Sequence, residues 1–189
     1  LFPGVVIPIT VGRDKSIKLI RDANKGTRMI GVVAQHDVNI EDPTFSQLHT
    51  VGTVALIVKM LQMPDGNTTV ILQGKKRFLL KEEVQSEPYI KATIEPFKDI
   101  KAKEDKEFKA MVSSIKDMAM NIIQLSPNIP SEAGIAIRNI ESTSFLINFI
   151  ASNMNADTAA KQQLLEEANL RQRANLVLGH LTLDIQMLE

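Results

Sequence analysis

The sequence predicts an α+β protein in which a β-rich half precedes a helical half. Runs of β-branched residues separated by short turn-like segments fill most of residues 1–97, a spacing typical of strands. Through residues 98–189, apolar residues recur three and four positions apart, as expected for helices with one buried face. The composition also changes at Lys98, where a charged stretch begins. We therefore expect two domains, residues 1–97 and residues 98–189.

The first half opens with a strand, a short helix and a second strand. Residues 5–11 form a β-branched run, and Pro8 within it is typical of an edge strand or a bulge. Residues 14–26 predict a helix that begins at Asp14 as its N-cap and stops at a glycine. Residues 29–35 are predicted to form the second strand, and a loop follows.

A hairpin is the clearest local signal of this half. Residues 51–63 and 68–72 are β-prone runs, and the Pro-Asp-Gly-Asn segment between them favours a tight turn. Two more strands are expected at residues 77–84 and 89–97. Strands in this number, with turns at short spacing, predict a small twisted sheet or a partly closed barrel.

The second half predicts a helical bundle. One apolar face over residues 108–122 indicates a long helix, and two prolines follow it. Three shorter helices are expected at residues 131–140, 142–154 and 157–167, and the predicted N-caps are Ser131, Ser142 and Asp157.

A long final helix is expected over residues 170–188. Its apolar residues alternate in steps of four and three, which places them on one continuous seam. Such a seam pairs either with another subunit or with the rest of its own chain. Because the chain starts at Leu1 in an apolar run and stops at Glu189 inside this pattern, we expect a piece of a longer protein.

Bulk composition narrows the classes of function. Lysine plus arginine (22) equals aspartate plus glutamate (22), whereas proteins that bind nucleic acids usually carry a basic surplus. The chain has no cysteine, so disulfides and cysteine-based zinc sites are excluded. No apolar run approaches the roughly 18 residues of a membrane span, and no signal peptide opens the chain. We expect a cytoplasmic protein that does not bind membranes, and the charge balance disfavours nucleic-acid binding without excluding a local basic patch.

The motifs of the common enzyme classes do not occur. The spacing of the nine glycines excludes the dinucleotide-binding fingerprint and the nucleophile elbow of serine hydrolases. Gly74-Lys75 lacks the other residues of a phosphate-binding loop, since Thr69 and Lys76 stand in their places. The three histidines include no pair four residues apart, and we interpret His36 as a surface histidine. We therefore expect no catalytic residues, no metal and no cofactor in this chain.

Several stretches together resemble the N-terminal domain of Lon ATP-dependent proteases. The first is Leu-Phe-Pro-Gly at residues 1–4 with the strand, turn and helix beyond it. Residues 29–35 with Asp42-Pro43 and residues 51–55 resemble the next block. Later blocks are Met63-Pro64-Asp65-Gly66, Gly74 with Arg77-Phe78, and residues 88–92. The resemblance covers most of residues 1–97, whereas the helical half matches in layout.

This resemblance implies a β-rich lobe of the PUA-like type, residues 1–97, and a helical lobe, residues 98–189, whose long helix leads toward an ATPase module. It also implies substrate recognition in protein quality control, in which unfolded, damaged or degron-bearing client proteins are delivered to a homo-hexameric protease. ATP and Mg²⁺ would bind to the absent ATPase module of the parent protein. No catalytic residue is carried over to this chain.

Client binding needs exposed apolar side chains that adapt to many sequences, and methionine suits this role. We expect such residues at the hairpin tip, where a small sheet has little core to bury them; the other possibility is that they pack under a neighbouring loop. A second candidate is the opening Leu-Phe-Pro segment. The predicted substrate-binding residues are therefore Met60, Leu61, Met63, Pro64, Phe2 and Pro3.

Three other functions remain open at this point. The chain could be a stand-alone adaptor related to the Lon N-terminal domain. A PUA-like lobe could instead bind RNA or DNA through the basic cluster of Lys75, Lys76, Arg77 and Lys81 beside Phe78, although a solvated strand end is the simpler interpretation. A small hydrolase is the least favoured, because its motifs are absent.

Overall fold

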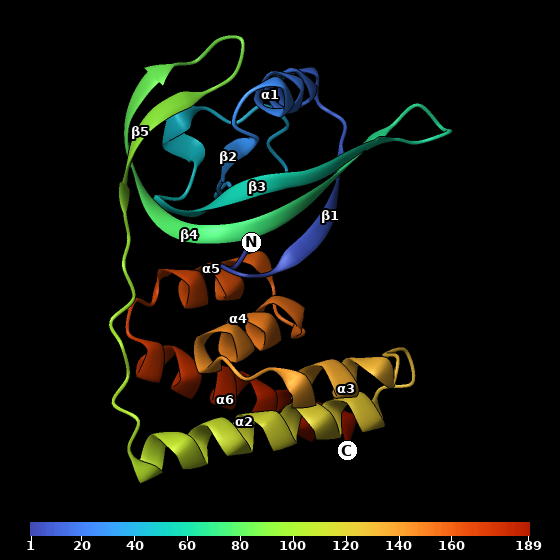
Figure 1. Cartoon of the computed structure of the whole chain (residues 1–189), viewed down its shortest axis with the longest axis vertical. Helices are drawn as coiled ribbons and strands as arrows, with labels where there is room; N and C mark the ends of the chain where they lie inside the picture. The colour runs from blue at the N-terminus through green and yellow to red at the C-terminus, as the bar shows by residue number, and fades with distance from the viewer. The chain divides into compact units, whose positions relative to one another are not determined.

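The computed structural model describes residues 1–189, which divide into two units, Leu1–Lys98 and Asp99–Glu189. The first unit contains all the strands, and the second contains five of the six α-helices (Figure 1). This is the predicted α+β class, with a β-rich part before a helical part.

Five antiparallel strands form one open sheet in the first unit. They are β1 (Val6–Val11), β2 (Met29–Val32), β3 (Val51–Gln62), β4 (Thr68–Gln85) and β5 (Lys91–Pro96). The order of paired strands is β1-β4-β3-β2, and β5 pairs with β4 outside that path. Helix α1 (Asp14–Lys25) and a short 3-10 helix, η1 (Phe45–Gln47), complete this unit.

The core of the first unit lies between helix α1 and the sheet. Ile20 of α1 is buried in a cluster with inward-facing residues of three strands, and Ile17 and Ala23 pack against it from the same helix. These are the apolar positions whose spacing predicts the helix. The strand residues of this cluster are Val11, Ala55, Ile57, Val70 and Leu72.

Strand β4 differs from the prediction, which divided it into two strands at residues 68–72 and 77–84. It is one strand of 18 residues. Its first part pairs with β1 and its second part with β5, and the pairing with β3 skips from Gly74 to Lys76. This bulge at Lys75 bends the strand without ending it, so one strand pairs with β3 and, in succession, with β1 and β5.

Gly74 lets the N-terminal segment approach β4 closely. A Cβ atom at this position would lie 2.3 Å from the carbonyl oxygen of Phe2, far inside van der Waals contact. The amide of Gly4 donates to the carbonyl of Gly74 at 2.9 Å, and the amide of Gly74 donates to the carbonyl of Val5 at 2.9 Å. Glycine is therefore needed at this position, because only a residue without a Cβ atom lets the N-terminal backbone contact the backbone of β4.

Two boundaries predicted in this unit are wrong. The N-cap of α1 is Arg13, and Asp14 is the first helical residue, where its carboxylate still faces the positive end of the helix dipole. The second strand ends at Val32, and beyond it Gln35 makes only an isolated bridge to Leu48. The predicted strand is longer because apolar residues continue beyond Val32, whereas the pairing of β2 with β3 ends there.

The second unit contains five helices, α2 (Lys106–Leu125), α3 (Glu132–Asn139), α4 (Thr143–Asn153), α5 (Thr158–Glu166) and α6 (Leu170–Leu188). Their positions match the predicted helices closely. Helices α2 and α6 pack along each other, and the α6 seam is buried through Leu170, Ala174, Val177 and Leu181. The seam was predicted to pair either with another subunit or with its own chain, and in the structure it packs against helices of its own chain.

Side-chain caps define where most of these helices begin. Asp105, Ser142, Asp157 and Asn169 each accept a hydrogen bond from a backbone amide in the first turn of α2, α4, α5 and α6. The predicted caps Ser142 and Asp157 are thus confirmed. The third, Ser131, has helical backbone angles and makes no cap hydrogen bond.

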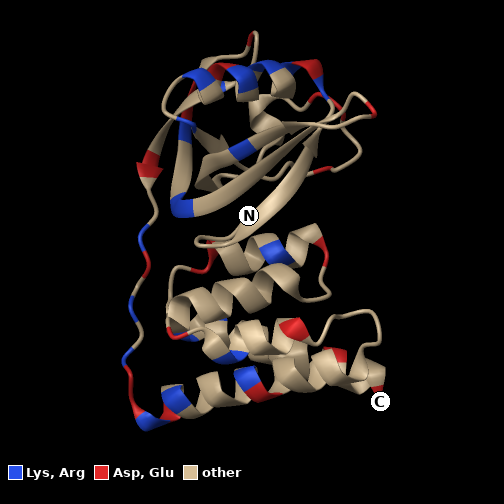
Figure 2. Cartoon of the chain, turned by 45° about the vertical axis from the view of Figure 1, so that its right-hand side comes forward, with Lys and Arg blue, Asp and Glu red and all other residues tan.

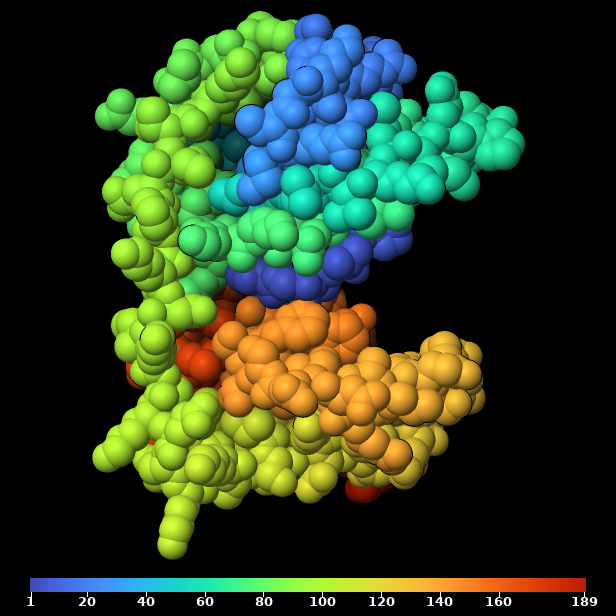
Figure 3. Space-filling view, in the orientation of Figure 1, coloured from blue at the N-terminus to red at the C-terminus, as the bar shows by residue number.

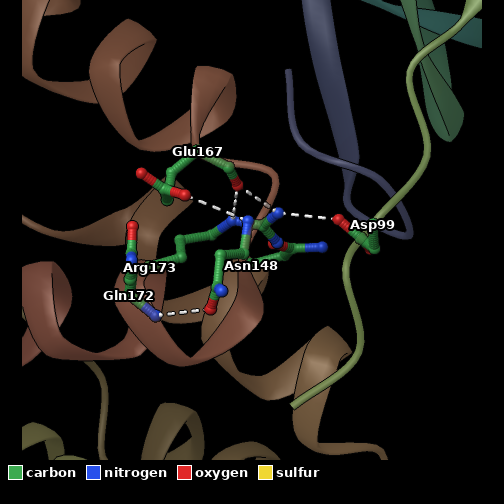
Figure 4. Close-up of polar contacts among 6 residues, drawn as sticks. Asp99, Asn148, Glu167, Gln172 and Arg173 are labelled. Atoms are coloured by element: carbon green, nitrogen blue, oxygen red, sulfur yellow. Dashed lines mark hydrogen bonds and ion pairs between the residues drawn. The ribbon is translucent and has the colours of Figure 1, made fainter.

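A buried arginine fixes the segment that enters the helical unit (Figure 4). The side chain of Arg173 in α6 is 1% exposed. Its Nη1 donates to Asn148 of α4 at 2.9 Å, its Nη2 donates to Asp99 at 2.7 Å, and its Nε donates to the carbonyl of Glu167 at 3.0 Å. Beside it, Ile100 exchanges backbone hydrogen bonds with the turn before α6. One guanidinium therefore ties together three separate segments.

Candidate functional site

The tip of the β3–β4 hairpin carries exposed apolar side chains. Met60 is 36% exposed and Met63 is 42% exposed, whereas Leu61 is half-buried and Pro64 lies in the exposed turn. Figure 3 shows this hairpin projecting from the rest of the sheet. The predicted tip residues therefore include two accessible methionines, whose flexible side chains suit contacts with varied apolar sequences.

The turn that holds these residues is well ordered by hydrogen bonds. The amide of Met63 donates to the carbonyl of Asn67 at 2.8 Å, and the amide of Gly66 donates to the carbonyl of Met63 at 3.0 Å. Gly66 has φ of 89°, a conformation that favours glycine. Asp65 accepts the amide of Asn67 at 3.0 Å. The Pro-Asp-Gly-Asn segment thus forms the predicted turn and presents the methionines beside a hydrogen-bonded turn.

The second predicted candidate, the opening segment, has little exposed apolar surface. Phe2 is only 4% exposed, and Pro3 is half-buried. The expectation that Phe2 offers a free contact surface is not met, because its backbone lies against β4 at Gly74.

The basic cluster on β4 does not form one open basic surface. Arg77 is buried, and its guanidinium carbon lies 4.5 Å from the centre of the Phe97 ring, a cation–π contact within this unit. Phe78 is buried as well. Lys81 pairs with Glu95 at 3.1 Å. Lys75, Lys76 and Lys81 are exposed, but Lys81 is paired with an acid and Arg77 is buried, so only two of the four cations are both exposed and outside these contacts.

An apolar groove in the helical unit was not predicted from the sequence. It has a volume of about 440 Å³ and is lined by the C-terminal parts of α2 and α6 together with α3, α4 and the segments beside them. Its deepest residues are the buried Ala119, Ile137, Ile150, Met154 and Leu181, and Ile122, Ile123, Ile129 and Phe149 extend it toward solvent. Helix α4, which contributes to it, carries no charged residue (Figure 2).

One charged side chain, Asp184 of α6, lines this groove. Burial among apolar neighbours raises the pKa of its carboxyl group, while His180 one turn earlier and the backbone amide of Asn155 act in the opposite direction. Such a carboxylate is poorly solvated when it is ionised. No sequence signal marks it, since the lining residues come from four helices that only the fold brings together.

The structure contains no group of three histidine, aspartate or glutamate side chains placed to hold a metal ion. His36, the histidine singled out in the sequence, packs against His49, with ring centres 4.1 Å apart and ring planes tilted by 52°. None of the helices is both long and apolar enough to cross a bilayer.

Known proteins of similar sequence are Lon proteases. The chain is 55% identical over 190 residues to the Lon protease of Flavobacterium johnsoniae and 50% identical over 190 residues to that of Cytophaga hutchinsonii. In both cases all of this chain is covered, and it spans 23% of the relative's length. The relatives are thus much longer than the chain described here.

Solved structures share the fold. The N-terminal domain of a Lon protease from the Mycobacterium avium complex matches with a TM-score of 0.75 at 20% identity, over 96% of this chain and 92% of that one. A Lon N-terminal domain protein from Xanthomonas campestris matches with a TM-score of 0.64 at 16% identity, over 95% and 91%. The family model of the ATP-dependent protease La (Lon) substrate-binding domain matches residues 1–182. The chain therefore belongs to the family of Lon substrate-binding domains.

Proposed function

We propose that this chain captures unfolded or degron-bearing client proteins for an ATP-dependent Lon protease and takes no part in the chemistry itself. The observation that carries the proposal is the pair of accessible methionines, Met60 and Met63, on the projecting β3–β4 hairpin. Exposed, adaptable apolar side chains bind unfolded segments through contacts that do not depend on one sequence.

The rest of the parent protein completes the proposed role. The proposed parent is a cytoplasmic homo-hexamer whose ATPase module, with ATP and Mg²⁺, unfolds clients, and whose protease module cleaves them. The 23% share of the relatives' length that this chain spans leaves room for both modules. It also favours a tethered recognition domain over a stand-alone adaptor.

The hairpin can be tested by fluorescence anisotropy with a labelled, permanently unfolded protein. Met63→Asp places a charge where an apolar client segment would have to pack, so its affinity should fall by about tenfold, the effect of losing roughly 1.4 kcal/mol of binding free energy. Val84→Asp is the matched control, because Val84 is 65% exposed on β4 away from the hairpin turn, and its affinity should match that of the unchanged chain.

Equal affinities for the unchanged chain and a folded Met63→Asp variant would remove the hairpin from the proposed site. Labelled RNA titrated in parallel tests the nucleic-acid alternative. Tight RNA binding that weakens steeply with salt would favour that alternative and contradict the proposal.

A further inference from the structure

We propose that the apolar groove of the helical unit binds a short apolar client segment that carries one lysine or arginine, whose cation pairs with Asp184. This inference rests on the proposed function and specifies the chemistry of the client. It concerns residues separate from the hairpin, which lies in the other unit.

The groove has the dimensions of a site for a few side chains. Its volume of about 440 Å³ lies within the range of roughly 300–1,000 Å³ that is typical of ligand pockets. The buried floor is made by five apolar side chains, and the half-exposed Ile122, Ile123 and Phe149 form its sides. A segment of a few apolar residues could therefore leave water in this groove without any change in the helices.

The charge of the groove indicates what such a segment must contain. Asp184 is the single charged residue among its lining residues, and no lysine or arginine lines it. A wholly apolar ligand would cover the carboxylate and remove its remaining water, which carries an energetic cost unless a partner is supplied. A ligand with one cation near its apolar residues supplies that partner. Burial raises the pKa of the Asp184 carboxyl although His180 acts against the shift, which agrees with a carboxylate that is already partly shielded from water.

A second copy of this chain is a less suitable occupant. Stable association between two proteins usually buries about 1,200–2,000 Å², whereas this groove accepts only a few side chains.

The test uses the 189-residue chain and short labelled peptides of leucine and alanine. One peptide has a central arginine, the second has glutamine at that position, and the third has glutamate. The unchanged chain should bind the arginine peptide roughly five- to tenfold more tightly than the glutamine peptide, as expected for a partly exposed charge-assisted hydrogen bond. Asp184→Asn should abolish this preference. The matched control Asp117→Asn, an exposed acid on α2, should keep it.

A second pair of variants tests the apolar part of the groove. Ala133→Trp fills the groove from α3 and should weaken binding of all the peptides, whereas Ala136→Trp adds the same ring to an exposed position of that helix outside the groove and should not. A folded Asp184→Asn variant that still prefers arginine would overturn the proposal. So would a concentration-dependent dimer that dissociates on Ala133→Trp, since the occupant would then be a second copy.

The unfolded protein used to test the hairpin is titrated alongside the peptides. This distinguishes failure of the groove assignment from failure of the proposed function. If the unfolded protein binds while the preference for the arginine peptide survives Asp184→Asn, the groove assignment is wrong and the proposed function stands. If neither the unfolded protein nor any peptide binds, both are contradicted.

Discussion

Replacing Asp99 by asparagine removes the carboxylate that faces the buried guanidinium of Arg173, while leaving a side chain of nearly the same shape. In the native structure Arg173 Nη2 lies 2.7 Å from Asp99 Oδ1, and the arginine is 1% exposed whereas the aspartate side chain is 39% exposed. The arginine keeps its hydrogen bonds to Asn148 and to the carbonyl of Glu167. The substitution therefore leaves a hydrogen-bonded but uncompensated buried charge.

The size of the effect follows from these exposures. Removing one partner of a fully buried ion pair costs about 3–5 kcal/mol. Because the Asp99 side chain is 39% exposed, water already screens its charge, and we expect a smaller loss of about 2–3 kcal/mol. Arg173→Met removes the buried charge as well but takes a donor from Asn148 and from the Glu167 carbonyl, which should cost about 2–4 kcal/mol.

The effects of the two substitutions on the free energy of unfolding should not be additive. Once Arg173 is methionine, its ion pair with Asp99 is gone, and Asp99→Asn should cost clearly less stability than it does in the native chain. Urea unfolding followed by far-UV circular dichroism measures all four states of this cycle. The exposed Glu104 on the same segment supplies the control Glu104→Gln, which should have little effect. A cost for Asp99→Asn that is equal in both backgrounds would refute the assignment of an ion pair to this anchor.

Three further predictions concern packing and charge. Gly74→Ala should destabilise the chain by about 2 kcal/mol or more in urea unfolding, because the added Cβ meets the Phe2 carbonyl. The matched substitution Gly179→Ala, whose Cβ has no atom within 4 Å, should stabilise α6 by about 0.5–1 kcal/mol. Asp105 accepts the amide of Phe108 and pairs with Arg171, and these contacts lower the pKa of its carboxyl below 3.8. The contribution of these contacts to stability should be complete above the unfolded-state pKa and lost as pH falls through the folded-state pKa. Asp105→Ala should therefore flatten this part of a profile of Tm against pH. Burial raises the pKa of Asp184 in the folded state, so stability should fall as pH rises from the unfolded-state pKa to the raised folded-state pKa. Asp184→Asn should therefore raise Tm at neutral pH and not in acid.

Each of these has a result that would contradict it. Equal effects of the two glycine substitutions would mean that the close approach at Gly74 is unimportant. An NMR titration that finds Asp105 ionising at or above its ordinary pKa would contradict the proposed cap. A lower Tm for Asp184→Asn at neutral pH would mean that the carboxylate stabilises the unfilled groove.

Local pattern predicted most of the helical unit and much of the sheet. The apolar seam of α6, the caps Ser142 and Asp157, and the turn at the β3–β4 hairpin are all local features, and the structure contains each of them. Strand β4 was divided in the prediction because Gly74 and the two lysines after it interrupt the alternation of apolar residues. Pairing with β3 on both sides of the bulge at Lys75 keeps the strand continuous, and such long-range pairing cannot be read from residue types.

The features that sequence reasoning missed depend on tertiary contacts. Arginine is ordinarily a surface residue, so nothing at Arg173 predicts a buried anchor whose partners lie 74 and 25 positions away. The groove around Asp184 is likewise assembled from separate helices. The sequence left open whether Met60 and Met63 are exposed at the hairpin tip or packed under a neighbouring loop. The structure exposes both, whereas their part in client binding stays a prediction.

The most direct measurement of the central claim is the affinity of this chain for one labelled protein in its folded form and in a permanently unfolded form, at low and high salt. The proposal predicts binding to the unfolded form alone, with an affinity that persists at high salt because apolar contacts supply it. Equal affinity for both forms, or binding that disappears when salt is raised, would contradict recognition of unfolded clients through exposed apolar surface.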